Sequence, residues 1–183
     1  TRDVVEDAIR ITAEALPWLG ARRARVAVCG VNPHAGEGGD IGREEVDVVA
    51  PVVRRLRRLG LKVTGPLPGD TVFHDAARGA YDAVVAMYHD QGLAPLKLIA
   101  FDSGVNITLG LPIVRTSPDH GTAFDLAGSN RARPDSMAEA LRWAIRLAGR
   151  RNPWREDQPM PRRRGTSPLV AAAGSRGASP PCA

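Results

Sequence analysis

RVAVCGVNPHAGEGG, residues 25–39, joins a short β-rich run to a loop of asparagine, proline and glycine. Residues 25–31 predict a buried strand, and the loop continues to Gly42. A helix is predicted from about Arg43 to Leu59, with four apolar residues on one face: Val46, Val49, Val53 and Leu56. Gly60 is a natural stop for this helix. A strand, a loop and a helix in this order form the repeating unit of α/β folds.

The same alternation continues on both sides of this stretch. Upstream, apolar spacing predicts a helix over residues 2–18. Downstream, the pattern predicts strands at 61–63, 81–88 and 104–111, a loop at 65–71, an extended segment at 112–117, a short helix within 119–127 and a final helix at 135–148. We therefore expect an α/β domain with a mainly parallel sheet and flanking helices.

The composition changes after residue 149. Proline, arginine, glycine, serine and alanine dominate residues 150–183, and apolar spacing disappears. Such a segment cannot bury enough apolar surface to offset the entropy lost on ordering. We expect residues 1–149 to form the folded domain and residues 150–183 to be a disordered tail, either an interaction segment or an extension without function.

The charge distribution argues against several classes of partner. The formal net charge is +5, yet residues 1–149 carry 18 lysines or arginines and 18 aspartates or glutamates. The excess therefore lies in the tail, and we expect no nucleic-acid partner. No apolar run approaches the ~20 residues needed to span a bilayer, so we expect no membrane partner. Cys29 and Cys182 offer no disulfide framework, which suits a reducing compartment, and the cytoplasm is the expected location.

Two histidines follow predicted strands. His34 follows the strand at 25–31 and His89 ends the strand at 81–88, so both are expected at one edge of a parallel sheet. Neutral imidazole is a common ligand of divalent transition metals, and Asp90 could add a further ligand or support one. Two surface histidines without a metal remain an alternative. GEGGDIG, residues 36–42, resembles a dinucleotide fingerprint, but Ile41 replaces its third glycine, and a flexible turn is the other interpretation.

Three polar residues lie in apolar surroundings further along the chain. Lys97 sits within LAPLKLIA, and Asn106 and Arg115 sit within VNITLGLPIVR. Lys97 is either a snorkelling side chain or an anion-binding group. A buried arginine or asparagine needs a partner, which could be a structural carboxylate or a bound anionic substrate.

Four motifs together resemble one family. CGVNPHAGEGG, GPLPGDT, MYHDQG and GVNITLGLPIVRTSPDHGTAFDLAG, in this order, are similar to the 4-hydroxythreonine-4-phosphate dehydrogenases of pyridoxal phosphate biosynthesis, over roughly residues 1–148. The resemblance implies an isocitrate and isopropylmalate dehydrogenase-like fold, in which two α/β subdomains flank a cleft. It also implies NAD-dependent oxidation of a secondary alcohol in 4-phosphohydroxy-L-threonine, followed by decarboxylation.

Matched position by position, the resemblance assigns roles to residues of this chain. His34 and His89 correspond to metal ligands, and Lys97, Asn106 and Arg115 correspond to substrate-contacting positions. The loop with His120, Gly121 and Thr122 corresponds to the segment that holds the adenosine part of NAD. The implied cofactors are NAD and a divalent cation, whether zinc, manganese, cobalt or magnesium. The implied partners are a phosphorylated hydroxy-amino acid and a second subunit that shares the metal site.

The sequence also departs from the family pattern. The family has a third histidine ligand and further substrate contacts upstream of the position where TRDVV begins here. We therefore expect this chain to be the C-terminal part of such an enzyme, with at most two of three protein ligands for the metal. A truncated, non-catalytic remnant and a threonate or erythronate 4-phosphate dehydrogenase are the alternatives.

Overall fold

The computed structural model describes residues 1–155 and 169–173. Its first sheet is parallel, with the strand order β2-β1-β3. The strands are β1 (Val26–Cys29), β2 (Val63–Leu67) and β3 (Ala83–Val85). All four residues of β1 are buried, as expected for a parallel strand covered on both faces. Burial raises the pKa of the Cys29 thiol to about 11.

Helices flank this sheet. They are α1 (Arg2–Leu19), α2 (Ala50–Arg58), α3 (Val72–Ala77) and α4 (His89–Ala100). The main core cluster joins α1 and α2 to the sheet through Ile9, Leu16, Val26, Val28, Val53 and Leu56. The loop after β1 contains the turn η1 (Pro33–Gly39), and a π-helical turn, η2 (Glu45–Val49), leads into α2.

The π-helical turn changes which side chains face the core. The sequence predicts Val46 on the buried face, but Val46 is 39% exposed and Glu45 is only 2% exposed. A π-helical turn carries more residues than an α-helical turn, so it shifts the phase of the side chains that precede α2. The helix predicted at 43–59 is therefore present as the π-helical turn η2 followed by α2, and a polar residue, Glu45, is buried at its start.

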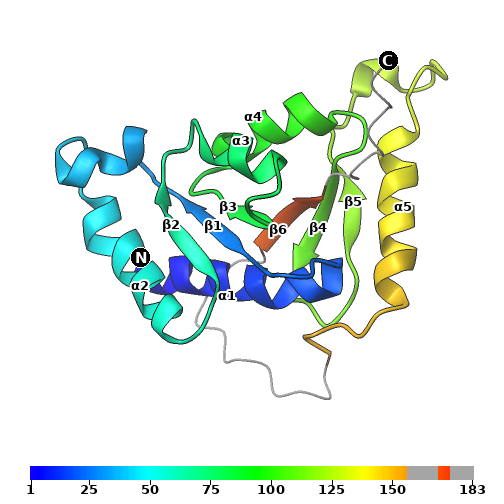
Figure 1. Ribbon diagram of the computed structural model, residues 1–183. Helices are drawn as coiled ribbons and strands as arrows, with labels where there is room; N and C mark the ends of the chain where they lie inside the picture. Colours follow the sequence, from blue (N-terminus) through cyan, green and yellow to red (C-terminus); the bar gives the residue numbers. More distant parts are fainter. Residues whose placement is uncertain (156–168, 174–183) are drawn as a thin grey trace, which may run out of the picture.

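A second sheet is antiparallel, with the order β5-β4-β6. Its strands are β4 (Val105–Leu109), β5 (Thr116–Pro118) and β6 (Leu169–Ala173). The turn η3 (Phe124–Leu126) precedes α5 (Asp135–Ala148), whose Trp143 and Leu147 pack on β4. Figure 1 shows α1 running along the lower side of both sheets, and its buried residues contribute to both cores.

The prediction of α/β class with a parallel sheet and flanking helices is confirmed, and the antiparallel second sheet is an addition to it. Two stretches also differ in detail. The predicted loop at 65–71 begins later, because β2 continues to Leu67 through a cis Gly65–Pro66 bond. LAPLKLIA, for which the sequence predicts no element, is helical as part of α4 despite Pro95.

The prediction that residues 150–183 lack packed structure is wrong for the described parts of that segment. Trp154 is buried, with its ring edge-on to Trp18 at a centroid distance of 5.8 Å. Arg150 donates a hydrogen bond to the Trp18 carbonyl at 2.7 Å. Residues 169–173, LVAAA, pair with β4 along its whole length, because this short apolar run can supply a strand. Residues 156–168 and 174–183 lie outside the described residues.

In the described part of the chain, no helix combines the length and the apolar character needed to cross a membrane.

Candidate functional site

The loop after β1 has an unusual backbone. His34, Ala35 and Glu37 have φ values of 51°, 54° and 43°, and the glycines between and after them are also left-handed. Each non-glycine residue in this region costs about 1–2 kcal/mol relative to right-handed backbone. Such a run persists only where surrounding contacts determine it.

Glu45 provides those contacts. Its buried carboxylate accepts hydrogen bonds from the backbone N–H of Val31 at 2.6 Å and of Asn32 at 2.8 Å, and from the Asn32 side chain at 2.9 Å. Burial alone would raise the pKa of Glu45, but the hydrogen bonds from Asn32 and Val31 outweigh it and hold the pKa below its usual value. The carboxylate is therefore a charged anchor for the loop.

The glycines of the loop make room for this anchor. A Cβ on Gly30 or Gly36 would lie 3.0 Å or 2.6 Å from a carboxylate oxygen of Glu45. The backbone N–H groups of Val31 and Asn32, which could otherwise face a phosphate, already bind this carboxylate. Of the glycines in GEGGDIG, Gly36 therefore has a structural reason of its own, which is close packing against Glu45.

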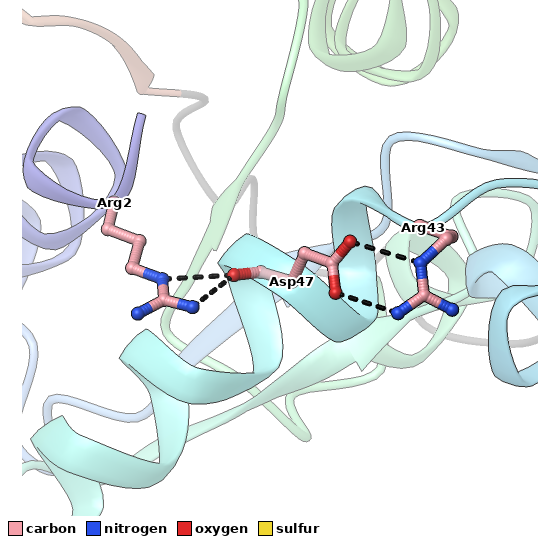
Figure 2. A network of polar contacts seen from close by, with 3 residues as sticks. All are labelled: Arg2, Arg43 and Asp47. Atoms are coloured by element: carbon pink, nitrogen blue, oxygen red, sulfur yellow. Dashed lines mark hydrogen bonds and ion pairs between the residues drawn. The ribbon is translucent and has the colours of Figure 1, made fainter.

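The far end of the loop is fixed by a second set of polar contacts. Arg43 binds the carboxylate of Asp47 at 3.0 Å and 3.2 Å, and Arg2 of α1 donates to the Asp47 carbonyl at 2.7 Å and 2.9 Å. Figure 2 shows the three side chains in line. The loop is therefore held between the start of α1 and the π-helical turn.

His34 lies exposed on this loop. Its Nδ1 is 2.6 Å from the Glu37 carboxylate. This hydrogen bond raises the pKa of His34, and the charges of Glu37 and Asp70 raise it further. Asp70 belongs to the loop after β2, so the loops following two neighbouring strands approach each other here. With Nδ1 engaged, Nε2 is the ring nitrogen left for a ligand.

Gln91 ties the loop after β3 to the same edge. Its side chain accepts from the Met87 N–H at 2.8 Å and donates to the Gly30 carbonyl at 2.8 Å. His89 and Asp90 begin α4 at this point, and both are exposed. His34 and His89 thus lie beyond the carboxyl ends of β1 and β3, where the sequence places them.

The metal-binding role of these histidines stays a prediction. Within the described residues, no group of three or more histidines, cysteines, aspartates or glutamates is arranged to hold a metal ion. Glu45 and Gln91, which shape this edge, are absent from the residues singled out in the sequence. The only signal for Gln91 is its place in MYHDQG, and Glu45 looks like an ordinary surface residue of an amphipathic helix.

The predicted substrate residues lie on α4 and beside β4. Lys97 donates to the Asp119 carbonyl at 2.8 Å and lies 3.5 Å from the Asp119 carboxylate. Arg115 is exposed and donates to the Thr108 hydroxyl at 2.8 Å. In the described part of the chain, the buried Oδ1 of Asn106 has no hydrogen-bond partner. Lys97 therefore has a structural carboxylate beside it, whereas Asn106 retains an unused acceptor.

The predicted cofactor loop begins next to this group. His120, Gly121 and Thr122 are all exposed, and His120 Nδ1 lies 2.9 Å from the Gly121 carbonyl. They follow Asp119 directly, so the contact between Lys97 and Asp119 joins the cofactor loop to the substrate group. Within the described residues, the side chains of these three residues make no further hydrogen bond or ion pair, and their role stays a prediction.

Comparison with known proteins agrees with these motifs. The family described as Pyridoxal phosphate biosynthetic protein PdxA matches residues 1–144. The chain belongs to this family. The 4-hydroxythreonine-4-phosphate dehydrogenase of Caulobacter vibrioides is 55% identical over 152 residues, which cover 82% of this chain and 46% of the relative. That of Bradyrhizobium diazoefficiens is 53% identical over 149 residues, covering 81% and 43%.

Comparison with solved structures agrees with the family match. The 4-hydroxythreonine-4-phosphate dehydrogenase of Klebsiella pneumoniae superposes with a TM-score of 0.73 at 52% identity, covering 81% of this chain and 45% of that one. A terephthalate 1,2-cis-dihydrodiol dehydrogenase of Burkholderia xenovorans superposes with a TM-score of 0.63 at 38% identity, covering 81% and 47%. The chain spans about half the length of the relatives it matches.

Proposed function

We propose that this chain is the C-terminal part of an NAD-dependent, metal-assisted dehydrogenase that oxidises and decarboxylates 4-phosphohydroxy-L-threonine in pyridoxal phosphate biosynthesis. The observation that carries the proposal is identity above 50% to named 4-hydroxythreonine-4-phosphate dehydrogenases over the residues that build the site. The convergence of the loops after β1, β2 and β3 supports it, because ligands of α/β sheets bind at the carboxyl ends of strands.

The chemistry of the donors fits a divalent transition metal. Glu37 engages Nδ1 of His34, which leaves Nε2 for the metal in the carboxylate–histidine–metal arrangement common in proteins. His89 would bind from the start of α4, and imidazole favours zinc, manganese or cobalt over magnesium. A bound cation would lower the pKa of the substrate hydroxyl and stabilise negative charge that develops on oxygen. The remaining ligand would come from outside residues 1–183, and we propose a homodimer that shares the metal.

The group around Lys97 would hold the anionic parts of the substrate. Lys97 and Arg115 are cations on α4 and beside β5, and Asn106 offers its unused Oδ1 as an acceptor. Arginine can bind a phosphate or carboxylate through two parallel hydrogen bonds. The exposed loop of His120, Gly121 and Thr122 would hold the adenosine side of NAD. Asp119 would then place substrate and cofactor side by side through its contact with Lys97.

Two observations keep alternatives in view. Because the chain spans 43–46% of its curated relatives, it is also a candidate for a non-catalytic remnant. The likeness to a terephthalate dihydrodiol dehydrogenase indicates that proteins with this fold are named for more than one substrate. The alternative substrate is a threonate or erythronate 4-phosphate, because the sequence motifs do not distinguish it from 4-phosphohydroxy-L-threonine.

The test is NADH formation from 4-phosphohydroxy-L-threonine. We expect no detectable turnover by the chain alone, because positioning within a complete cleft supplies roughly 7–11 kcal/mol of barrier reduction in well-oriented systems. Addition of the N-terminal half of a homologue, which residues 1–183 do not match, should restore turnover. His89→Ala should then abolish it, whereas His74→Ala, an exposed histidine of α3, should not. Restored turnover that survives His89→Ala would contradict the assignment of the metal ligands.

A further inference from the structure

Charge is separated between the two edges of the parallel sheet. The connections that precede β1, β2 and β3 carry five cations, Arg22, Arg23, Arg25, Lys62 and Arg78, against the single acid Asp82. The last turn of α2 adds two more, Arg57 and Arg58. The connections at the opposite, histidine-bearing edge carry Glu37, Asp40, Glu44 and Asp70 against Arg43, and the first turn of α4 adds Asp90. The balanced total of residues 1–149 conceals this separation.

A cavity of about 390 Å³ opens at the basic edge of the sheet, the edge where β1, β2 and β3 begin. Three cations line it, Arg25, Arg57 and Lys62, together with the hydroxyl-bearing residues Thr64 and Tyr81. Its volume falls within the range of about 300–1,000 Å³ that is common for small-molecule sites. The cavity is formed by residues on either side of β1 and β2, away from His34 and His89.

The three cations differ in whether a carboxylate already neutralises their charge. Arg25 binds the Asp82 carboxylate through Nε and Nη2, each at 3.1 Å, so its charge is largely compensated. Within the described residues, Arg57 and Lys62 make neither an ion pair nor a side-chain hydrogen bond. The cavity therefore presents two cations whose charge is available to a ligand.

A simpler role for these cations is to complement the dipole of α2, since cations are favoured near helix C-termini. This accounts for Arg57 and Arg58 but not for Lys62 or Arg78, which lie beyond the helix. The last carbonyls of α2 also accept backbone hydrogen bonds, from Leu59, Gly60 and Leu61, so capping does not occupy the side chains. The cations exceed what the helix requires.

We propose that this cavity is a second anion site, in which Arg57 and Lys62 bind the phosphate group of a small metabolite. With Arg25 and Asp82 included, the formal charge of the lining is +2, which complements a phosphate monoester carrying about −1.5 to −2 at pH 7. Arg57 can bind two phosphate oxygens at once, and Lys62 adds a compact charge. An open pocket of about 390 Å³ at the end of α2 and the start of β2 suits a small ligand better than an extended nucleic-acid strand.

Binding of phenyl phosphate and of inorganic phosphate to the full chain tests this proposal. Amide chemical shifts should be followed by NMR at about 150 mM salt, where interactions between distant charges are screened. We expect saturable shifts of residues 57–64, weakened by about tenfold or more in Arg57→Gln/Lys62→Gln, because each charged hydrogen bond contributes appreciably to affinity. The double variant Arg22→Gln/Arg23→Gln removes the same charge from the same edge outside the cavity, and its affinity should stay within about twofold of wild type.

Four outcomes would overturn the proposal. Equal weakening in both double variants would show a diffuse field in place of a site. Shifts of residues 57–64 that do not saturate would show the same. Tighter binding of a single-stranded oligonucleotide, at equal phosphate concentration, would identify a nucleic-acid surface. Shifts confined to residues 97–115 would place phosphate at the candidate substrate group, and Lys97→Gln separates that site, since it should leave the shifts of residues 57–64 intact.

Discussion

Glu45 is the residue on which the histidine-bearing loop depends. A charge that is 2% exposed is stable only when hydrogen bonds replace the water it has lost. Three donors from Val31 and Asn32 do so, and their hold on the carboxylate lowers its pKa. The same three bonds fix the backbone just before His34. The position of a candidate ligand is thus set by a residue eleven positions later in the sequence.

We expect Glu45→Gln to lower the free energy of unfolding by about 1.5–3 kcal/mol near neutral pH, the usual contribution of hydrogen bonds to a charged group. Since the pKa of Glu45 is lowered in the folded state, its contribution is fully present above 4.5 and is lost as pH falls through the folded value. The difference between variant and wild type should therefore shrink in acid. Urea unfolding at several pH values measures this, with the exposed Asp40→Asn as the control. A difference that grows on acidification would contradict the role of the charge.

At the scale of elements, the sequence predicted those parts whose signal is local. β1 was predictable because four consecutive apolar residues can only be buried, and α5 because its apolar residues recur at helical spacing. α4 was missed, because Gly92 and Pro95 interrupt any helical pattern and its first turn is polar. Contacts distant in sequence were also out of reach: Lys97 meets Asp119 across 22 positions, and β6 reaches β4 across an even longer interval.

The loop after β1 offers a matched pair of substitutions. Gly36 and Gly38 have similar positive φ values, 80° and 73°, but a Cβ on Gly36 would lie 2.6 Å from Glu45 whereas a Cβ on Gly38 meets nothing within 4 Å. We expect Gly38→Ala to cost about 1–2 kcal/mol from backbone strain alone. Gly36→Ala should cost a further ~1–3 kcal/mol from overpacking. Equal losses in chemical denaturation would show that the loop yields around Glu45.

At the scale of the whole molecule, α1 connects two cores that belong to different sheets. Ile9 and Leu16 pack with the parallel sheet, whereas Ala15 and Trp18 pack with the antiparallel one. Trp18 in turn meets Trp154, which lies beyond residue 144, where the match to the family ends. The folded unit therefore extends past the boundary that composition suggests.

Truncation of the Trp154 side chain tests this extension. We expect Trp154→Ala to lower the free energy of unfolding by about 3–5 kcal/mol, as for other buried tryptophans. Trp154→Phe keeps much of the ring packing but loses the Nε1 hydrogen bond to Glu14, at 3.2 Å, and should cost about 1 kcal/mol. Thermal or urea unfolding distinguishes the two variants. An unchanged stability in Trp154→Ala would show that residues 150–155 do not belong to the folded unit.

The separation of charge across the parallel sheet also decides how the molecule meets a charged surface. Arginines and lysines gather where the strands begin, and carboxylates gather where they end, so the domain carries a permanent dipole although residues 1–149 are formally neutral. On a negatively charged support the domain would adsorb by its strand-start edge. The edge with His34 and His89 would then face the solution, open to the proposed metal, substrate and second subunit, and immobilisation would need no engineered tag.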